Sequence, residues 1–159
     1  MDESLAQMHF NAALAALDAH YQAMPPVAAM RLRIAGFDGE TLHLQAPLAH
    51  HVNDKGCAFG GSLVSLMTLA AWGLVTLRLQ QAGLRADVFV ADSQVRYLAP
   101  LYDDLNAGAR LAADASWEQF LADLRERGRA SVSIEACVCL PDGAPAAQCR
   151  ARYVAIAKG

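Results

Sequence analysis

The sequence has little charge, and neither sign is in large excess. Charged residues make up 18% of the 159 residues, and the net charge is −3. Such a composition does not supply the basic surface that binds a phosphate backbone, so we expect no nucleic-acid partner. Hydrophobic residues make up 55%. This apolar excess must be buried in a core, in a subunit interface or in a pocket for an apolar ligand.

The sequence also lacks paired cysteine motifs. Its four cysteines are Cys57, Cys137, Cys139 and Cys149, and no two form a C-x-x-C pair. Cys137 and Cys139 are two residues apart in one predicted strand, which disfavours a disulfide between them. We therefore expect no disulfide framework, no metal site and no cofactor. The first residues lack the charged-then-apolar pattern of a signal peptide, so we expect a cytoplasmic protein.

One segment lacks charge altogether. Residues 56–77 carry no charged side chain between Lys55 and Arg78, and this length is sufficient to cross a bilayer. The segment contains several small and polar residues, and amphipathic strands are predicted on both sides of it. We favour a buried central helix over a membrane span, because those strands need an apolar element to cover. No membrane association is expected.

Hydrophobic periodicity predicts an α+β fold built around this long helix. The expected elements, in chain order, are a helix that ends before Pro25-Pro26, strands 30–34 and 42–45 around a turn at Asp38-Gly39, a helix from about Gly60 to Gln81, strands 88–98 and 105–111, a short helix after Ser116, and strands 132–140 and 149–157. An antiparallel sheet curled around the long helix accounts for this order. We expect a single domain, with an N-terminal helix (1–24) ahead of the main body (25–159).

The most informative segment is a polar loop, residues 50–58, that leads to Gly60 and Gly61 at the start of the long helix. Free backbone N–H groups at a helix N-terminus carry partial positive charge. Glycine permits a close approach, so the N–H groups of residues 60–62 can stabilise an oxyanion that develops on a bound carbonyl. The alternative is that the glycine pair only lets the helix pack tightly against a strand.

Two stretches resemble the thioesterases of the YiiD C-terminal-domain family: NDKGCAFGGSLVSL at 53–66 followed by LAAWGL at 69–74, and ADSQVRYLAP at 91–100. The resemblance extends from about residue 25 to the end of the chain. It implies the hotdog fold, with an antiparallel sheet wrapped around a long central helix. It also implies a homodimer or higher homo-oligomer with sites at the subunit interface, acting in the cytoplasm on acyl-CoA or acyl carrier protein.

The resemblance leaves the catalytic carboxylate undetermined. Many hotdog thioesterases carry Asp or Glu on the central helix, seven residues after the second glycine, but here that position is Thr68. Asp92 is the candidate to replace it as the base that activates water, because burial in mid-strand would raise the pKa of a carboxyl group. The alternative is a structural carboxylate, hydrogen-bonded to loop N–H groups or paired with Arg96.

The other candidate residues surround the glycine pair. Asn53 can orient a water or the thioester oxygen, or it can cap a turn. Ser62 begins a polar stripe that can line a cleft beside an acyl chain or bond back to helix carbonyls. A serine nucleophile needs a base, and the helix contains no His or Lys. The predicted site comprises the catalytic residues Asn53, Gly61, Ser62 and Asp92 and the substrate-binding residues Phe59, Gly60, Ser65 and Thr68.

Two other functions remain open. A non-catalytic acyl-thioester-binding module is favoured by the absence of a carboxylate on the helix. A hydratase or dehydratase on the same fold would need a histidine or acid near the acyl β-carbon, and only His50 and His51 lie near the loop. Adjacent side chains point apart on an extended chain, so we interpret both histidines as solvated or structural.

Overall fold

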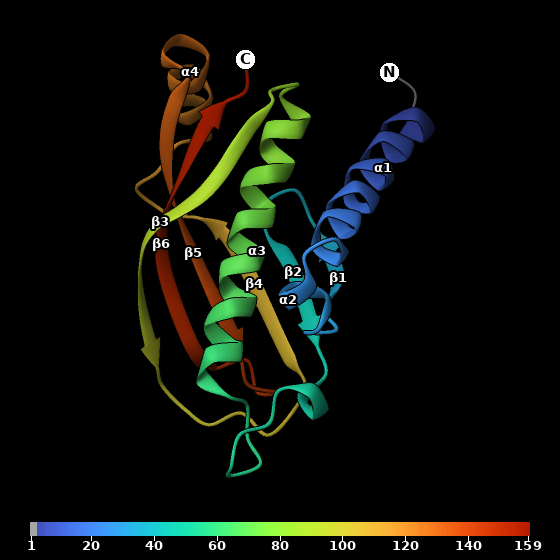
Figure 1. Cartoon of the computed structure of the whole chain (residues 1–159), viewed down its shortest axis with the longest axis vertical. Coiled ribbons are helices and arrows are strands. Elements are labelled where there is room, and N and C mark those ends of the chain that lie inside the picture. Colours follow the sequence, from blue (N-terminus) through green and yellow to red (C-terminus); the bar gives the residue numbers. More distant parts are fainter. Residues whose placement is uncertain (1–2) are drawn as a thin grey trace.

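The computed structural model describes residues 3–159, so the first two residues of the predicted N-terminal helix lie outside the described residues. The elements are α1 (Glu3–Gln22), α2 (Pro25–Ala28), β1 (Arg33–Phe37), β2 (Leu42–Ala46), the 3-10 helix η1 (Leu48–His50), α3 (Gly60–Gln81), β3 (Ala86–Tyr97), β4 (Leu105–Leu111), α4 (Trp117–Arg127), β5 (Arg129–Cys139) and β6 (Pro145–Ala157). In Figure 1, α3 runs along one face of a curved sheet, and α1 lies beside α3.

The sheet contains six antiparallel strands in the order β1-β2-β4-β5-β6-β3. On β5, alternate residues from Ala130 to Val138 are buried, and this face packs against α3. The other face carries the polar residues between them, as expected for a strand with one dry face. The predicted α+β hotdog fold, an antiparallel sheet around a long central helix, is confirmed.

Helix α3 is apolar on nearly every side. It is long and apolar enough to cross a membrane, but 56% of its apolar stretch is buried inside the protein. Leu66, Met67, Ala70 and Val75 have no exposed surface. The four strands β2, β4, β5 and β6, together with β3, supply most of the contacts. A helix whose sides are covered in this way needs an apolar composition without any membrane.

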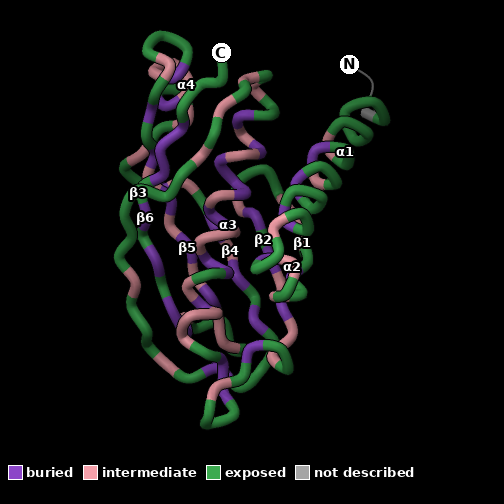
Figure 2. Tube along the Cα trace, viewed as in Figure 1, coloured by how far each residue is buried: buried purple, intermediate pink, exposed green. Residues whose placement is uncertain are grey.

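The C-terminal half of α1 belongs to the same core. Leu17 and Tyr21 are buried, whereas the first turns of α1 are exposed (Figure 2). The Tyr21 hydroxyl donates a hydrogen bond to the carbonyl of Leu69 on α3 at 2.7 Å. Burial raises the pKa of Tyr21, so this hydroxyl stays a donor. Gly73 lies directly under the Tyr21 hydroxyl, which lets the two helices approach closely.

The first strand differs from its prediction. Residues 30–34 were expected to form a strand, but the chain forms α2 first, and β1 begins only at Arg33. Pro25 is suited to the first turn of a helix, because its missing N–H would have no acceptor there. Met30 donates to the carbonyl of Val27 at 3.0 Å. Arg31 then adopts a left-handed φ of 56°, which turns the chain into β1.

Candidate active site

A tight loop delivers the chain to the start of α3. The backbone N–H of Phe59 donates to the carbonyl of His51 at 2.7 Å, and Val52 pairs with Ala58. The Asn53 side-chain oxygen accepts from the N–H groups of Lys55 and Cys57 at 2.8 and 3.2 Å, and its amide donates to the Cys57 sulfur. The hydrogen bonds of the Asn53 side chain with other described residues therefore stay within the loop. This geometry matches the turn-capping alternative.

The first turn of α3 presents free backbone donors. Ser62 and Leu63 both donate to the carbonyl of Phe59, at 3.0 and 3.1 Å. Within residues 3–159, the N–H groups of Gly60 and Gly61 have no acceptor. The N-cap residue Phe59 makes no side-chain cap, and the first turn contains no acidic residue. The helix start is therefore an electropositive end that can accept an anionic or carbonyl oxygen.

Two aromatic rings border these glycines. A Cβ added at Gly61 would lie 2.5 Å from the Phe59 ring, and one added at Gly60 would lie 3.4 Å from the ring of Tyr97. Both rings are more than half exposed, Phe59 at 55% and Tyr97 at 57%. The N–H of Ala58 donates to the carbonyl of Leu101, which ties this loop to the segment after β3. Glycine at 61 accommodates the Phe59 ring as well as leaving the N–H groups accessible.

Ser62 contacts a histidine that sequence analysis did not pair with it. The His51 Nδ1 lies 2.8 Å from the Ser62 Oγ, and the His51 Nε2 lies 2.7 Å from the carbonyl oxygen of Met30. His51 is 5% exposed, and it is a buried polar side chain. The prediction that a serine nucleophile lacks a base considered only the helix, and the interpretation of His51 as solvated or structural did not include this contact. The sequence feature that could have indicated this contact is a histidine shortly before a Gly-Gly-Ser sequence.

The other two hydroxyls of the stripe have no such partner. Ser65 is exposed and Thr68 is half-buried. Neither hydroxyl has a side-chain bond among the described residues. The backbone carbonyl of Thr68 accepts from the hydroxyl of Tyr153 at 3.2 Å. The roles of Ser65 and Thr68 as substrate contacts remain predictions.

Asp92 lies on the opposite side of the sheet from α3. A bulge between Val90 and Asp92 shifts the register, so Val90 pairs with the buried Tyr153 but Asp92 pairs with the exposed Arg152. The expectation that Asp92 is buried was wrong: its side chain is 68% exposed and forms an ion pair with Arg152 at 3.0 Å. Its partner is Arg152 and not Arg96. The catalytic role of Asp92 remains a prediction, and this position favours the structural alternative.

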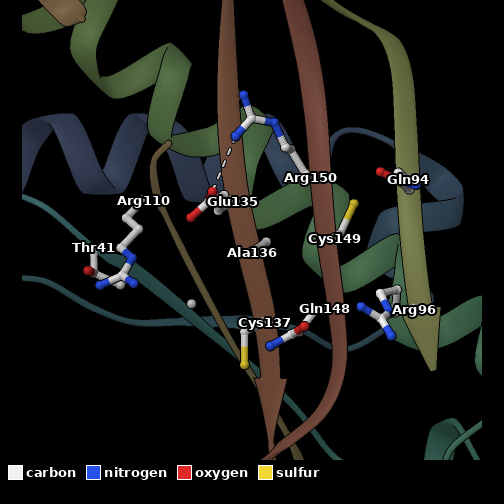
Figure 3. Close-up of a pocket in the computed structure, with 11 residues that line it drawn as sticks. Thr41, Gln94, Arg96, Arg110, Glu135, Ala136, Cys137, Gln148, Cys149 and Arg150 are labelled. Carbon is white, nitrogen blue, oxygen red and sulfur yellow. Dashed lines mark hydrogen bonds and ion pairs between the residues drawn. The ribbon is translucent and has the colours of Figure 1, made fainter. Parts of the chain in front are cut away.

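The outer face of the sheet holds a separate hollow of about 540 Å³, lined by residues of β3, β4, β5 and β6 (Figure 3). Arg150 donates to Asp114 at 2.9 Å, which lowers the pKa of that carboxyl, and to Glu135 at 3.3 Å. The Cys137 and Cys139 sulfurs are 3.1 Å apart. Burial and this contact raise the pKa of Cys137 to about 12. The hollow contains none of the eight predicted site residues.

The described residues contain no group of three His, Cys, Asp or Glu side chains placed to hold a metal ion. Cys57, which follows the loop glycine, is buried and packed against Asn53. Backbone N–H groups, the Ser62 hydroxyl and the His51 imidazole lie at the start of α3.

Comparisons with known proteins identify similar sequences and structures. The profile of the family described as "Putative thioesterase (yiiD_Cterm)" matches residues 14–157, so the match begins inside α1, earlier than residue 25. The structure of a putative thioesterase from Shewanella oneidensis is 29% identical, with a TM-score of 0.82, and the match covers 92% of this chain and 99% of that one. A protein of unknown function from Chlorobaculum tepidum is 28% identical with a TM-score of 0.83, covering 93% and 94%.

Proposed function

Because the chain belongs to the YiiD C-terminal-domain thioesterase family, we propose that it hydrolyses acyl thioesters of coenzyme A or of an acyl carrier protein. The observation that carries the proposal is that the N–H groups of Gly60 and Gly61 have no acceptor among residues 3–159. A thioester carbonyl seated there gains most when its oxygen becomes negative, and such differential stabilisation accelerates acyl transfer.

The surroundings of the helix start suit an apolar acyl group. Phe59, Tyr97, Leu98 and Tyr102 are all exposed hydrophobic side chains of this region. Exposed large apolar groups that gather beside polar donors are typical of a binding site. Ser65 and Thr68 provide hydroxyls that have no side-chain hydrogen bond among the described residues, and Asn53 keeps the loop closed. No cofactor enters this proposal, and the expected setting is cytoplasmic fatty acid metabolism.

We propose that the active form is a homodimer or a higher homo-oligomer. Strand β3 is a sheet edge of twelve residues that pairs only with β6, and it exposes Phe89 at 54% and Val90 at 46%. Much of β3 is exposed in Figure 2. A long, exposed edge strand is a template for pairing with another chain. Sedimentation of the protein at micromolar concentration tests this: a stable monomer contradicts the dimer.

The hydrolase and the non-catalytic binder are separated by one assay. The protein is incubated with butyryl-, octanoyl- and palmitoyl-CoA, and the released thiol is measured together with the melting temperature. Hydrolysis predicts thiol release well above the protein-free rate. Binding without chemistry predicts a raised melting temperature and no thiol. Acyl carrier proteins loaded with the same groups then compare the two carriers.

A further inference from the structure

The hydrogen bonds of His51 define which of its nitrogens carries the proton. A backbone carbonyl can only accept, so the His51 Nε2 donates to the Met30 oxygen at 2.7 Å. In the neutral imidazole the Nδ1 then has a free lone pair. The Ser62 Oγ lies 2.8 Å from this nitrogen. The Ser62 hydroxyl therefore donates to His51, and its proton already lies on the path to a base.

We propose that Ser62 is a nucleophile and His51 its general base, a dyad for acyl transfer. The inference rests on the proposed function for its substrate class. The Ser62 Oγ forms a bond to the thioester carbon while its proton moves to the His51 Nδ1. The C–S bond breaks, and the leaving thiolate takes that proton. Water then attacks the acyl-serine ester and gives one proton to Nδ1, which returns it to Ser62 as the carboxylic acid leaves.

The base is held in place by its own segment. The His51 N–H donates to the carbonyl of Leu48 at 2.8 Å, and its carbonyl accepts from Phe59 at 2.7 Å. The Met30 carbonyl takes the part that a carboxylate plays in a serine triad, because it fixes the tautomer and orientation of the ring. It carries no full charge, so it stabilises an imidazolium less than a carboxylate does.

The nucleophile lies beside the oxyanion donors. Side chains on a helix lean toward its N-terminus, so the Ser62 Oγ is directed to the end where the Gly60 and Gly61 N–H groups are free. Ser62 uses its own N–H in a bond to Phe59. A carbonyl carbon attacked by Oγ can therefore place its oxygen on the two glycine N–H groups, the arrangement that an acyl transfer needs.

The dyad also removes the difficulty of a central helix without a carboxylate. Ser65 and Thr68 lie on the same helix and have no side-chain partner among residues 3–159, so neither hydroxyl has a base. Asp92 lies across the sheet on its outer face. Among the described side chains, only His51 is bonded to a hydroxyl at the start of α3.

If the hydrogen bond between His51 and Ser62 is purely structural, the experimental outcome should differ. His51 connects α3 to the turn after α2, so its loss would lower the melting temperature even without any catalytic role. An alkyl fluorophosphonate separates the two possibilities, because only an activated hydroxyl attacks it. The Ser62 Oγ would form a bond to phosphorus, the P–F bond would break with release of fluoride, and the proton would pass to the His51 Nδ1.

The experiment labels the full chain with the fluorophosphonate and maps the adduct by peptide mass spectrometry. We expect one adduct, on Ser62, absent from Ser62→Ala and from His51→Gln. The glutamine can still donate to the Met30 carbonyl but offers Ser62 no imidazole. Ser131→Ala, which removes an exposed serine of β5, should label like the parent. Melting temperatures identify the variants that remain folded, and Ser62→Ala alone decides the matter if His51→Gln unfolds.

Turnover of octanoyl-CoA provides the second measurement. Ser62→Ala should lower kcat by at least about 10³-fold. Parent activity without labelling at Ser62, or Ser62→Ala turnover within about threefold of the parent, overturns the dyad and leaves the thioesterase proposal intact. Labelling at Ser62 without hydrolysis of any acyl-CoA or loaded carrier protein supports the dyad and contradicts the thioesterase proposal. The absence of both labelling and hydrolysis contradicts both.

Discussion

The start of α3 and the outer face of the sheet use polar groups in opposite ways. At the helix start, charge is absent from the first turn and the one histidine is 5% exposed. On the outer face, Arg150 and Arg152 form ion pairs with carboxylates in which every side chain is at least 40% exposed. Electrostatic interactions gain strength where water is excluded, and exposed ion pairs contribute at most about 1 kcal/mol each.

This difference indicates where chemistry can occur. Neutral hydrogen-bond donors that are partly shielded from water can polarise a carbonyl, whereas charged groups exposed to water mainly keep a surface solvated. The hollow in Figure 3 holds more charged groups than the helix start. Arg150, which lines the hollow, forms an ion pair with the neighbouring Asp114. If acyl transfer occurs at the helix start, as proposed, variants of the two regions should differ in activity far more than in stability.

Outside the dyad of His51 and Ser62, the largest effect is expected at Gly61. A valine there would place its branches at the free N–H groups and against the Phe59 ring, which lies 2.5 Å from the added Cβ. We predict that Gly61→Val lowers kcat/KM about 10²-fold, the value of one lost oxyanion donor. The Phe59 ring is 55% exposed and can move aside, so the melting temperature should change little. Steady-state hydrolysis of octanoyl-CoA and thermal melting measure the two effects.

A double variant tests why Gly61 is needed. Phe59→Ala removes the ring that a side chain at 61 would meet. If Gly61 only accommodates that ring, Gly61→Val combined with Phe59→Ala should turn over as Phe59→Ala does. If Gly61 also keeps the N–H groups open, the double variant should stay about as slow as Gly61→Val. Recovery of turnover in the double variant would show that Gly61 is needed only for packing against the Phe59 ring.

Gly73, further along α3, provides a comparison with Gly61. Glycine to alanine inside a helix normally stabilises by about 1 kcal/mol. Here the added Cβ would lie 2.0 Å from the Tyr21 hydroxyl and 2.9 Å from Leu42, and overpacking of this kind costs about 1–3 kcal/mol. We predict that Gly73→Ala lowers the free energy of unfolding by about that amount in urea titration. The folded fraction of Gly73→Ala should still react with the fluorophosphonate at Ser62. Loss of this labelling would show that a packing change at Gly73 also alters the start of α3.

The fold followed from the sequence, but the placement of side chains across segments did not. Alternation on β5 and the start of α3 at Gly60 were predicted, and Ser116 accepts from the N–H of Gln119 as its capping sequence indicated. These features depend on nearby residues. The bond from His51 to Ser62 spans eleven positions and two elements, so periodicity gives no sign of it.

Asp92 is a second residue whose position sequence alternation did not predict. Alternation alone places it on the face of Val88 and Val90, and a mid-strand carboxylate in that position would be buried. The bulge after Val90 and the edge position of β3 reverse this outcome. A bulge is one extra residue, and sequence alternation does not reveal where it falls.

The smallest effect is therefore expected at Asp92. As a base buried beside the substrate, its replacement by asparagine would lower kcat by roughly 10²–10⁴. With a side chain 68% exposed on the outer face and paired with an Arg152 that is 46% exposed, we predict that Asp92→Asn keeps kcat within about threefold of the parent. The lost ion pair should cost less than about 1 kcal/mol of unfolding free energy.

The comparison with Ser62→Ala makes this result decisive. Both variants are measured on octanoyl-CoA after their melting temperatures have been shown to match that of the parent. A large loss in Asp92→Asn together with a small loss in Ser62→Ala would move the chemistry to the outer face. That outcome would need β3 to present Asp92 to a substrate bound on the other side of the sheet from α3. The bond between His51 and Ser62 predicts the reverse order, because it is the site where a described hydroxyl and its base already meet.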